Sequence, residues 1–271
     1  MKTLPGAEEV NWEAARECLG ADGLLSIVLP CHNLGTVIAD NIRQVAATFR
    51  GRIAFEIIAV DDGSVDDTLD QLQAIKPECV ELRIVPLSPN QGKGHALRTG
   101  FGHTHGSHIL FLDADLDLPP HQTAWFFERM LQTGSDVVIG AKRHPRSELV
   151  YPRKRRMISA GYYTIVRLMF GLPVHDTQTG IKLFRRPVLE TVLPRMLVKR
   201  FAYDLELLVI ANHLGYKITE APITLNFHGR YGCLKYRVVR RATLDTLAIF
   251  YRLYILRYYK RPPQQIPKTQ K

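Results

Sequence analysis

Two groups of aspartates follow apolar runs of the sequence and could carry chemistry. Asp61 and Asp62 come directly after the run IAFEIIAV, and Asp113, Asp115 and Asp117 come directly after the run SHILFL. Because alternate residues of an extended segment point the same way, the three carboxylates of the second group are expected to converge. Carboxylates held together repel each other unless a cation or protons intervene. The pattern therefore predicts a hard divalent ion such as Mg²⁺, with open positions for phosphate oxygens.

The second aspartate group also has simpler interpretations. An EF-hand calcium loop is excluded, because Leu118 stands where that loop needs glycine and Ala124 where it needs glutamate. Asp117 is equally suited to capping a helix that begins near Pro119. Asp66, in the first group's motif VDDGSVDDT, is interpreted as a helix cap and not as a ligand.

Other motifs are less specific. The segment NQGKGHA lacks the GxxxxGK[ST] spacing of a phosphate loop, so it predicts either a turn that brings Lys93 to a nucleotide or a plain helix entry. His103, His105 and His108 have no further ligand nearby in the sequence and are expected to form a surface cluster. No GxGxxG motif follows a strand and no GxSxG motif is present. A dinucleotide dehydrogenase and a serine hydrolase are therefore not supported.

The elements that must position these residues alternate along the first half of the chain. Apolar strand-like runs alternate with helix-like stretches, and this pattern predicts βαβ units and a mostly parallel sheet. The predicted fold class is α/β, a Rossmann-like sheet flanked by helices, with ligands at the carboxyl ends of its strands. The expected strands are 24–29, 53–60, 82–86, 107–112, 136–140, 181–184 and 217–223. The expected helices are 37–49, 66–75, 93–103, one from about 119, 201–214 and a long amphipathic helix or helix pair over 234–259.

Composition and charge narrow the class of protein. The chain has 271 residues, 46% of them hydrophobic, which excludes disorder over its whole length. Lys and Arg number 36 against 26 Asp and Glu, a net charge of +10. Basic residues gather in 142–156 and 230–261, which favours nucleic acid, an anionic bilayer or a phosphorylated substrate over a merely soluble basic face. None of the four cysteines forms a CxxC pair, so a zinc ribbon and a disulfide scaffold are not supported.

The sequence predicts a cytoplasmic protein at the membrane face. The N-terminus lacks the apolar stretch of a signal peptide, and no window reaches about 18 uncharged apolar residues. Near the C-terminus, apolar residues recur at helical spacing between basic ones: Leu244, Leu247, Ala248, Tyr251, Tyr254 and Ile255. This stripe predicts either a helix in the membrane interface, with Arg252 and Arg257 at anionic headgroups, or a helix packed on the core. Phe250 and Leu253 lie off the stripe and leave surface for both uses.

An ordered set of motifs carries a family resemblance. SIVLPCHN, VDDGSVDDT, NQGKGHALRTG, FLDADLD, DTQTGIKLFRR and RFAYDLELL occur in that order. The chain resembles family 2 inverting glycosyltransferases of the GT-A fold, from about Leu24 to Lys260. It is most similar to the polyprenyl-phosphate branch, which includes dolichol-phosphate glucosyltransferases and mannosyltransferases. The resemblance implies a GT-A domain (24–230) after an N-terminal extension (1–23). The residue pattern predicts a basic amphipathic C-terminal helical segment (231–261) and a disordered tail (262–271).

The resemblance also implies roles for residues that match the family's motifs. Together with Lys93 of the glycine-rich turn, the residues expected to bind the nucleotide sugar are Pro30, Asp61, Asp62, Asp113, Ala114 and Arg230. Catalysis is expected from Asp115, Arg143 and Lys235, and binding of Mg²⁺ or Mn²⁺ from Asp115 and Asp117. Two positions depart from the family's pattern. Leu34 replaces a usual acidic residue, and the late R-x-x-G-x-S-K loop appears as RYGCLK, with its arginine displaced and Leu234 in place of serine.

The implied reaction is metal-dependent transfer of a hexose from UDP-glucose or GDP-mannose to a polyprenyl (dolichyl) phosphate. Negative charge builds on the leaving diphosphate, where a metal and Arg or Lys would stabilise it. A phosphate monoester has a second pKa of about 6, so it attacks at neutral pH without a strong base. The expected partners are a nucleotide sugar, the lipid phosphate and an anionic membrane, and no nucleic acid.

Two alternatives remain open. The same fold could transfer sugar to a glycan or protein hydroxyl, which would require a base such as Asp204 or Glu206. Those two residues are equally suited to fixing a helix start. The other alternative is a non-catalytic basic protein that binds membrane or nucleic acid. The acidic groups argue against it, because without metal they would repel phosphate.

Overall fold

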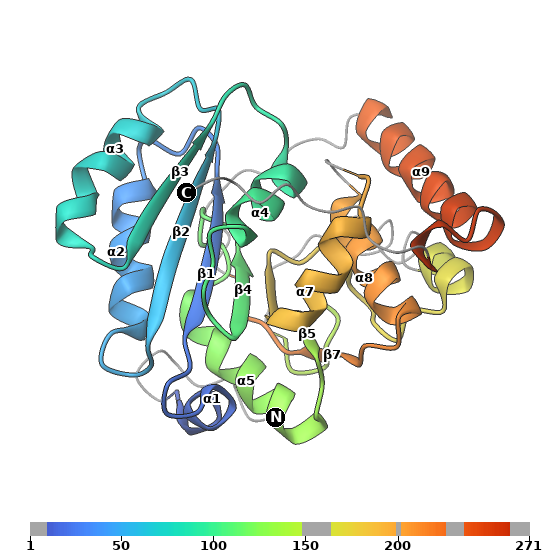
Figure 1. The fold of residues 1–271 in the computed structure, drawn as a ribbon, viewed down its shortest axis with the longest axis horizontal. Coiled ribbons are helices and arrows are strands. Elements are labelled where there is room, and N and C mark those ends of the chain that lie inside the picture. Colours follow the sequence, from blue (N-terminus) through green and yellow to red (C-terminus); the bar gives the residue numbers. More distant parts are fainter. Residues whose placement is uncertain (1–9, 148–163, 199–201, 226–235, 261–271) are drawn as a thin grey trace.

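The computed structural model describes residues 10–147, 164–198, 202–225 and 236–260. In these ranges one sheet has the strand order β3-β2-β1-β4-β6-β5-β7 (Figure 1). The strands are β1 (Leu25–Cys31), β2 (Phe55–Asp62), β3 (Leu82–Leu87), β4 (His108–Leu112), β5 (Val137–Gly140), β6 (Ile181–Arg185) and β7 (Ile218–Ala221). β6 is antiparallel to both β4 and β5, and the other neighbours are parallel. The predicted α/β class with a mostly parallel sheet is confirmed.

Helices cover both faces of the sheet, because the strands are apolar on both sides. In β1 the side chain of Val28 belongs to one buried cluster, whereas Ile27 and Leu29 belong to the other. This alternation follows from the two-residue period of a strand. One face is covered by α1 (Glu13–Leu19), α2 (Ile38–Phe49), α3 (Thr68–Ile75) and α5 (Thr123–Thr133). The other face is covered by α4 (Lys93–Phe101), α7 (Arg186–Val192), α8 (Tyr203–His213) and α9 (Tyr236–Phe250).

A glycine lets α4 pack closely against the sheet. A Cβ atom at Gly100 would lie 2.5 Å from Val28 Cγ1 and 2.8 Å from Val60 Cγ2. Such distances are shorter than real carbon contacts, so a larger residue would push the helix away from β1 and β2. Lys93 begins this helix, so the close packing also fixes the place from which Lys93 projects.

Both ends of the chain contribute to the core where they are described. Residues 10–23, predicted as an extension, contain α1, and Trp12 packs edge-on against Phe49 with ring centroids 5.3 Å apart. At the other end, Ile249, Leu253 and Tyr259 are buried in the same cluster as α8. The predicted boundary at residue 230 and the predicted tail at 262–271 lie outside the described residues. None of the described helices is both long and apolar enough to cross a bilayer.

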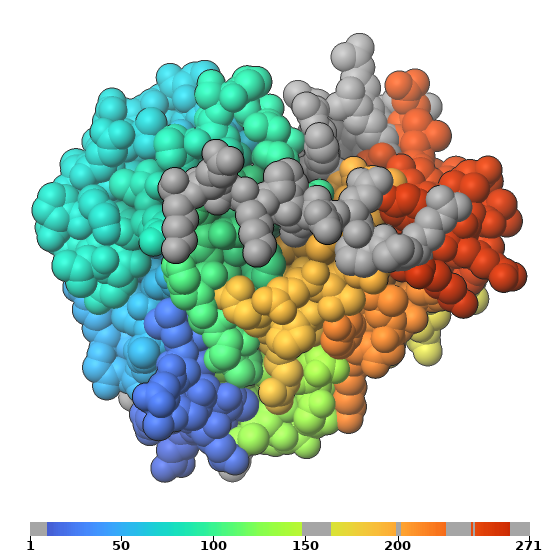
Figure 2. All heavy atoms as spheres, in the orientation of Figure 1, coloured from blue at the N-terminus to red at the C-terminus, as the bar shows by residue number. Residues whose placement is uncertain are grey.

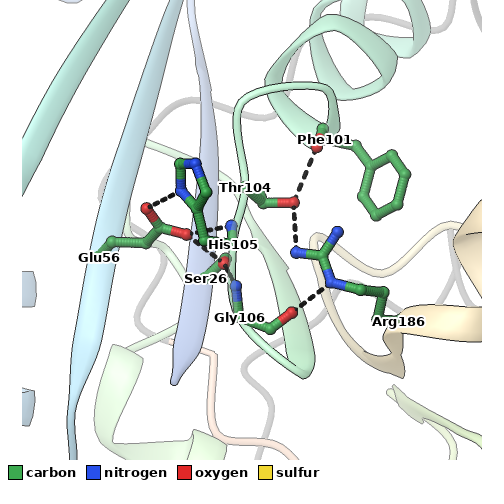
Figure 3. A network of polar contacts seen from close by, with 7 residues as sticks. All are labelled: Ser26, Glu56, Phe101, Thr104, His105, Gly106 and Arg186. Atoms are coloured by element: carbon green, nitrogen blue, oxygen red, sulfur yellow. Dashed lines mark hydrogen bonds and ion pairs between the residues drawn. The ribbon is translucent and has the colours of Figure 1, made fainter. Parts of the chain in front are cut away.

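A polar network fixes the turn between α4 and β4, at the end of the sheet where β1 begins (Figure 3). Ser26 Oγ donates to Glu56 Oε1 at 2.6 Å and accepts from the Gly106 N–H at 2.8 Å. The Arg186 guanidinium donates to the Gly106 carbonyl at 2.5 Å and to Thr104 Oγ1 at 3.0 Å. Burial raises the pKa of Glu56, but the bonds from Ser26 and His105 outweigh burial and hold that pKa below its usual range. The network therefore joins α7 to the start of β1, away from the carboxyl ends of the strands.

His108 is not part of a surface cluster, contrary to the prediction. It lies on β4 with 4% of its surface exposed, and its ring centroid is 5.6 Å from that of Phe127. Burial, with a smaller contribution from the charge of Arg185, lowers the pKa of His108 to about 4. Its neighbour His105 is exposed and bonds Glu56. His105 lies in the turn before β4, whereas His108 is the first residue of the strand, and their spacing in the sequence does not reveal this difference.

The buried imidazole predicts acid sensitivity of the fold. Because the unfolded chain binds this proton near pH 6.5 and the folded chain only near pH 4, lowering the pH through that window favours unfolding. The full effect is on the order of 3 kcal/mol. A His108→Leu variant is expected to lose less unfolding free energy than the wild type between pH 7 and pH 4.5, measured by urea denaturation. Equal losses in the two proteins would contradict this origin of the acid sensitivity.

Candidate active site

An open pocket of about 340 Å³ lies where β1, β2 and β4 end. Its wall is formed by Pro30, Cys31, His32, Leu34, Asp62, Asn90, Gly92, Lys93, Asp113, Ala114 and Asp115. β1 and β2 are paired so that Cys31 stands opposite Asp61, which brings the two strand ends level. Six of the residues predicted from the sequence therefore meet in one place: Pro30, Asp62, Lys93, Asp113, Ala114 and Asp115.

Asp62 orders the turn that leads to Lys93. Its two carboxylate oxygens accept hydrogen bonds from the backbone N–H groups of Gln91 and Gly92, each at 2.8 Å. The Asn90 side chain donates to the main-chain oxygen of Asp62 at 3.0 Å. A buried carboxylate is stabilised by such backbone donors. Asp62 therefore holds the 90–92 turn in place and lines the pocket beside it.

Asp61 does not line the pocket, although it was predicted to contact the nucleotide. It is buried, and its Oδ1 accepts hydrogen bonds from both the backbone N–H and the hydroxyl of Ser64. The Asp61 carboxylate is turned toward Ser64, whereas the Asp62 carboxylate is turned toward the 90–92 turn, and only Asp62 lines the pocket. On its own side Asp61 lies near Cys31, whose pKa is raised by burial first and by the Asp61 charge second. Cys31 therefore stays a neutral thiol in the pocket wall and is no nucleophile.

The charge in the pocket comes from an ion pair and a second carboxylate. Lys93 Nζ lies 2.5 Å from Asp113 Oδ1. Loss of water lowers the pKa of Lys93, but Asp113, Asp204 and Asp115 together outweigh that loss and raise the pKa above its usual value. Lys93 is therefore a permanent cation at the wall of the pocket.

The three aspartates after β4 lie near one another, but they do not form the three-carboxylate metal site that the prediction expected. The chain leaves the strand at Leu112 and turns at once, and Leu116 has a left-handed backbone with φ of +52°. Alternation along an extended segment therefore does not apply beyond Leu112. Asp117 lies outside the pocket wall, and its N–H donates to Asp115 Oδ1 at 3.3 Å. In the described ranges no group of three His, Cys, Asp or Glu side chains could hold a metal ion.

Asp115 nevertheless suits a divalent cation. Loss of water in the pocket raises its pKa, and the charges of Asp113 and Asp117 raise it further, while Lys93 lowers it less. The site thus has an excess of negative charge that a cation would relieve. Mg²⁺ is commonly held by one or two carboxylates, with phosphate oxygens and water completing its shell. Asp115, with Asp113 beside it, fits that arrangement, and Asp117 does not join it directly.

Gly180 supports Asp113 from the neighbouring strand. The Asp113 N–H donates to the Gly180 carbonyl at 2.9 Å, just before β6 begins. A Cβ atom at Gly180 would lie 2.2 Å from Asp113 Oδ2. The glycine of the DTQTG motif is therefore required by the close approach of the Asp113 side chain.

Gly180→Ala is expected to lower kcat/KM by roughly 10- to 100-fold, because the added methyl displaces the Asp113–Lys93 pair. The matched control is Gly102→Ala, which adds a methyl at an ordinary backbone conformation at the end of α4. Transfer rates and melting temperatures of both variants would be compared with the wild type. A Gly180→Ala protein with wild-type kinetics would show that the pair tolerates the shift.

A second ion pair lies behind the pocket. Lys182 on β6 has a side chain only 3% exposed, and its Nζ contacts Asp204 Oδ1 at 2.7 Å and the Thr179 carbonyl at 2.5 Å. Asp204 stands in the first turn of α8 and acts on the charge of Lys93 without lining the pocket. Charges therefore alternate from Lys182 through Asp204 and Lys93 to Asp113. Asp204 is one of the two candidate bases, but one of its carboxylate oxygens already pairs with the Lys182 ammonium.

Glu206, the other candidate base, has a structural role. It is completely buried and accepts hydrogen bonds from the N–H groups of Leu197 and Val198 and, at 2.6 Å, from the Tyr259 hydroxyl. Burial raises its pKa, and these partners together with Arg252 offset only part of that rise. Glu206 joins α8 to the C-terminal segment and does not reach the pocket.

Of the basic residues that were predicted to act in catalysis or binding besides Lys93, only Arg143 is described by the structure, and it does not line the pocket. Arg143 lies half-buried in the turns after β5. Arg230 and Lys235 lie outside the described residues. His32, which the sequence analysis did not single out, does line the pocket, as do Asn90 and Gly92 of the NQGKGHA motif. His32 comes directly after the end of β1, and that position was the one available signal for it.

Comparison with known proteins agrees with this geometry. The sequence profile of Glycosyl transferase family 2 matches residues 26–193, which is well over half of the chain. The chain belongs to glycosyltransferase family 2. This confirms the predicted family, and with it an enzyme that transfers glycosyl groups.

Of three relatives of this glycosyltransferase, two have dolichyl phosphate in their names. A dolichyl-phosphate beta-glucosyltransferase of Saccharomyces cerevisiae is 31% identical, over 74% of this chain and 66% of the relative. The glycosyltransferase AglD of Haloferax volcanii is 28% identical, over 73% of this chain and 32% of the relative. A dolichyl-phosphate beta-glucosyltransferase of Trichomonas vaginalis is 29% identical, over 84% of this chain and 74% of the relative. The chain thus spans only part of the length of these relatives.

Solved structures confirm the GT-A fold of this glycosyltransferase. Glucosyl-3-phosphoglycerate synthase from Mycobacterium tuberculosis, in complex with Mn²⁺, UDP-glucose and phosphoglyceric acid, has a TM-score of 0.66 at 20% identity. That comparison covers 97% of this chain and 86% of the other. Mannosyl-3-phosphoglycerate synthase from Rubrobacter xylanophilus has a TM-score of 0.66 at 17% identity, over 96% of this chain and 81% of the other.

Proposed function

We propose that this glycosyltransferase moves glucose from UDP-glucose to a polyprenyl (dolichyl) phosphate, assisted by Mg²⁺ or Mn²⁺. The observation that carries the proposal is the meeting of Lys93, Asp113 and Asp115 at the carboxyl end of the sheet. The names of the dolichyl-phosphate beta-glucosyltransferases support the lipid acceptor and favour glucose over the mannose of GDP-mannose. The Mn²⁺ and UDP-glucose bound by the structural neighbour support the metal and the donor.

The residues of the pocket fit the separation of charge in this reaction. An oxygen of the acceptor phosphate attacks the anomeric carbon from the face opposite the donor diphosphate, and the bond from that carbon to the diphosphate breaks. The Lys93 ammonium stabilises the negative charge that grows on the leaving diphosphate. A divalent ion at Asp115 would supply further charge stabilisation when bound. Asp62 keeps the turn that carries Lys93 in place.

The acceptor phosphate needs no strong base. Its second pKa is about 6, so at neutral pH it is mostly a dianion with no proton to remove. This agrees with Glu206 being buried outside the pocket and with Asp204 being held by Lys182. A sugar or protein hydroxyl would instead require a base, and neither of the two candidate bases, Asp204 and Glu206, lines the pocket.

The test is a transfer assay with labelled donors. The protein is incubated with Mn²⁺ or Mg²⁺, polyprenyl phosphate and either UDP-[¹⁴C]glucose or GDP-[¹⁴C]mannose, and the lipid fraction is extracted and counted. We expect the lipid fraction to be labelled when the donor is UDP-glucose. We expect no label when the acceptor is a polyprenol, with a free hydroxyl in place of the phosphate. Label from GDP-mannose alone would overturn the proposed donor, and transfer to the polyprenol but not its phosphate would overturn the acceptor.

A further inference from the structure

The C-terminal segment has two faces with different surroundings. It comprises α9 and a π-helical turn, Tyr251–Ile255. One face, with Ile249, Leu253 and Tyr259, is buried against the core. Leu253, expected off the apolar stripe, is thus the residue that packs inward. The large residues of the predicted apolar stripe are therefore not the ones that pack against the core.

The opposite face is apolar and exposed. Leu244, Leu247, Tyr251, Tyr254 and Ile255 are each between 47% and 63% exposed. They recur every three or four residues up to Tyr254, so they form one row, named here the C-terminal stripe. Scattered apolar residues are ordinary on a protein surface, but a contiguous row of large ones marks a contact site. Figure 2 shows α9 at the outer edge of one end of the molecule, where such a row can meet a large surface.

A second element with exposed apolar residues packs against α9. The helical residues 164–170 expose Ile165 at 54% and Leu168 at 82%. Phe170 of the same element packs edge-on against Phe250 of α9, with ring centroids 6.3 Å apart. Figure 1 shows this short yellow helix near one end of the α9 segment. The sequence pattern did not predict this element as part of the C-terminal surface.

The charges on this surface are complementary to an anionic partner. Arg240, Arg257 and Lys260 are exposed, and Asp245 is the single acidic residue between positions 236 and 260 of the sequence. Large apolar and tyrosine side chains, with cations at both ends of the row, suit the boundary between acyl chains and anionic headgroups. We propose that the C-terminal stripe, with Ile165 and Leu168, is the surface by which this enzyme docks on an anionic bilayer.

The docking surface is held rigidly to the catalytic domain. Arg252 Nη1 lies 3.3 Å from Glu206 Oε1, and the Tyr259 hydroxyl donates to the same oxygen. Glu206 belongs to the first turn of α8, as does Asp204, which acts on Lys93 in the pocket. The prediction that Arg252 contacts headgroups is therefore wrong, because its guanidinium contacts a buried carboxylate. Its role is to fix the angle between the docking surface and the pocket.

Vesicle binding tests the surface directly. The variant Leu247→Ser/Tyr251→Ser/Tyr254→Ser removes apolar contacts, and Arg240→Glu/Arg257→Glu reverses exposed charges. Each is expected to weaken co-sedimentation with phosphatidylcholine–phosphatidylserine vesicles by at least about tenfold. The matched control, Val65→Ser/Val80→Ser, removes two exposed apolar residues elsewhere and should bind like the wild type. Binding of the wild type should fall as salt rises and be weaker on phosphatidylcholine alone.

Several outcomes would overturn the proposal. One is a wild type that fails to bind anionic vesicles at low salt, and another is stripe variants, folded by their melting temperature, that bind normally. A wild-type dimer in sedimentation velocity that the serine variant dissociates would assign the stripe to a second copy of the chain.

The inference that this docking serves catalysis rests on the proposed function, and the two can fail separately. Stripe variants should keep wild-type transfer to a short, water-soluble prenyl phosphate and lose at least about tenfold with long polyprenyl phosphate in vesicles. If neither acceptor receives sugar while vesicle binding is intact, the proposed function is wrong but the proposed docking surface stands. Equal transfer by wild type and variants in vesicles would remove the link between docking and catalysis.

Discussion

Replacing Asp115 by alanine is expected to lower hexosyl transfer by roughly 100- to 1,000-fold while the protein remains folded. Asp115 lines the pocket, and burial first and the charges of Asp113 and Asp117 second raise its pKa. Removing this carboxylate takes away the ligand best placed for a divalent cation. It also relieves repulsion from Asp113 and Asp117, so the melting temperature should not fall.

The measurements are transfer rate, thermal unfolding and Mn²⁺ binding by calorimetry. Chelation of all divalent metal should reduce wild-type transfer to the level of the variant. Asp22→Ala, an exposed change before β1 at the other end of the sheet, is the matched control. Asp117→Ala should cost less than Asp115→Ala, because Asp117 lies outside the pocket wall. Full activity of Asp115→Ala in the presence of Mg²⁺ would refute the metal assignment.

Replacing Lys93 by methionine is the second large effect we expect, a fall of about 100-fold in kcat. The ammonium lies in the pocket beside Asp113, and its raised pKa keeps it charged through the neutral and mildly alkaline range. The diphosphate gains charge as it leaves, so the loss should appear mainly in kcat and less in the KM for the donor. Lys93→Arg should recover part of the rate, because it restores the charge with a different shape.

The control for this variant is Arg52→Met, which removes an exposed cation beyond the end of α2. Steady-state kinetics with varied donor separate the two parameters. A raised KM with unchanged kcat would mean that Lys93 binds the ground state of the donor and does not act on the leaving group.

Much of the first half of the fold follows from local patterns. The expected strand 24–29 is observed as Leu25–Cys31 and the expected helix 37–49 as Ile38–Phe49. Periodicity alone predicts such elements, because both strands and helices bury regular faces. The position and direction of β6 could not be predicted. A run such as IKLF predicts a strand, but its neighbours are decided by packing far along the chain.

The sequence predicted where in the fold the candidate site lies, but not the arrangement of all its side chains. Residues after strand ends were expected at the pocket, and Asp62, Lys93, Asp113 and Asp115 are there. Asp117 does not line the pocket with Asp113 and Asp115, because the left-handed backbone of Leu116 ends the extended segment. No residue pattern indicates that turn. Glu206 was ambiguous for a similar reason. Its partners, Leu197, Val198 and Tyr259, are contributed by tertiary structure.

The insertion of β6 between β4 and β5 has a consequence for how the chain is made. β5 ends at Gly140, yet its two neighbours in the sheet, β6 and β7, begin only at Ile181 and Ile218. At a synthesis rate of about 5 to 20 residues per second, β5 waits on the order of 2 to 8 seconds for its first neighbour. During that delay Val137, Val138 and Ile139, all completely buried in the finished protein, have no strand partner. The nascent enzyme therefore carries an unpaired apolar strand that chaperones can bind, while β1 to β4 are already able to pair.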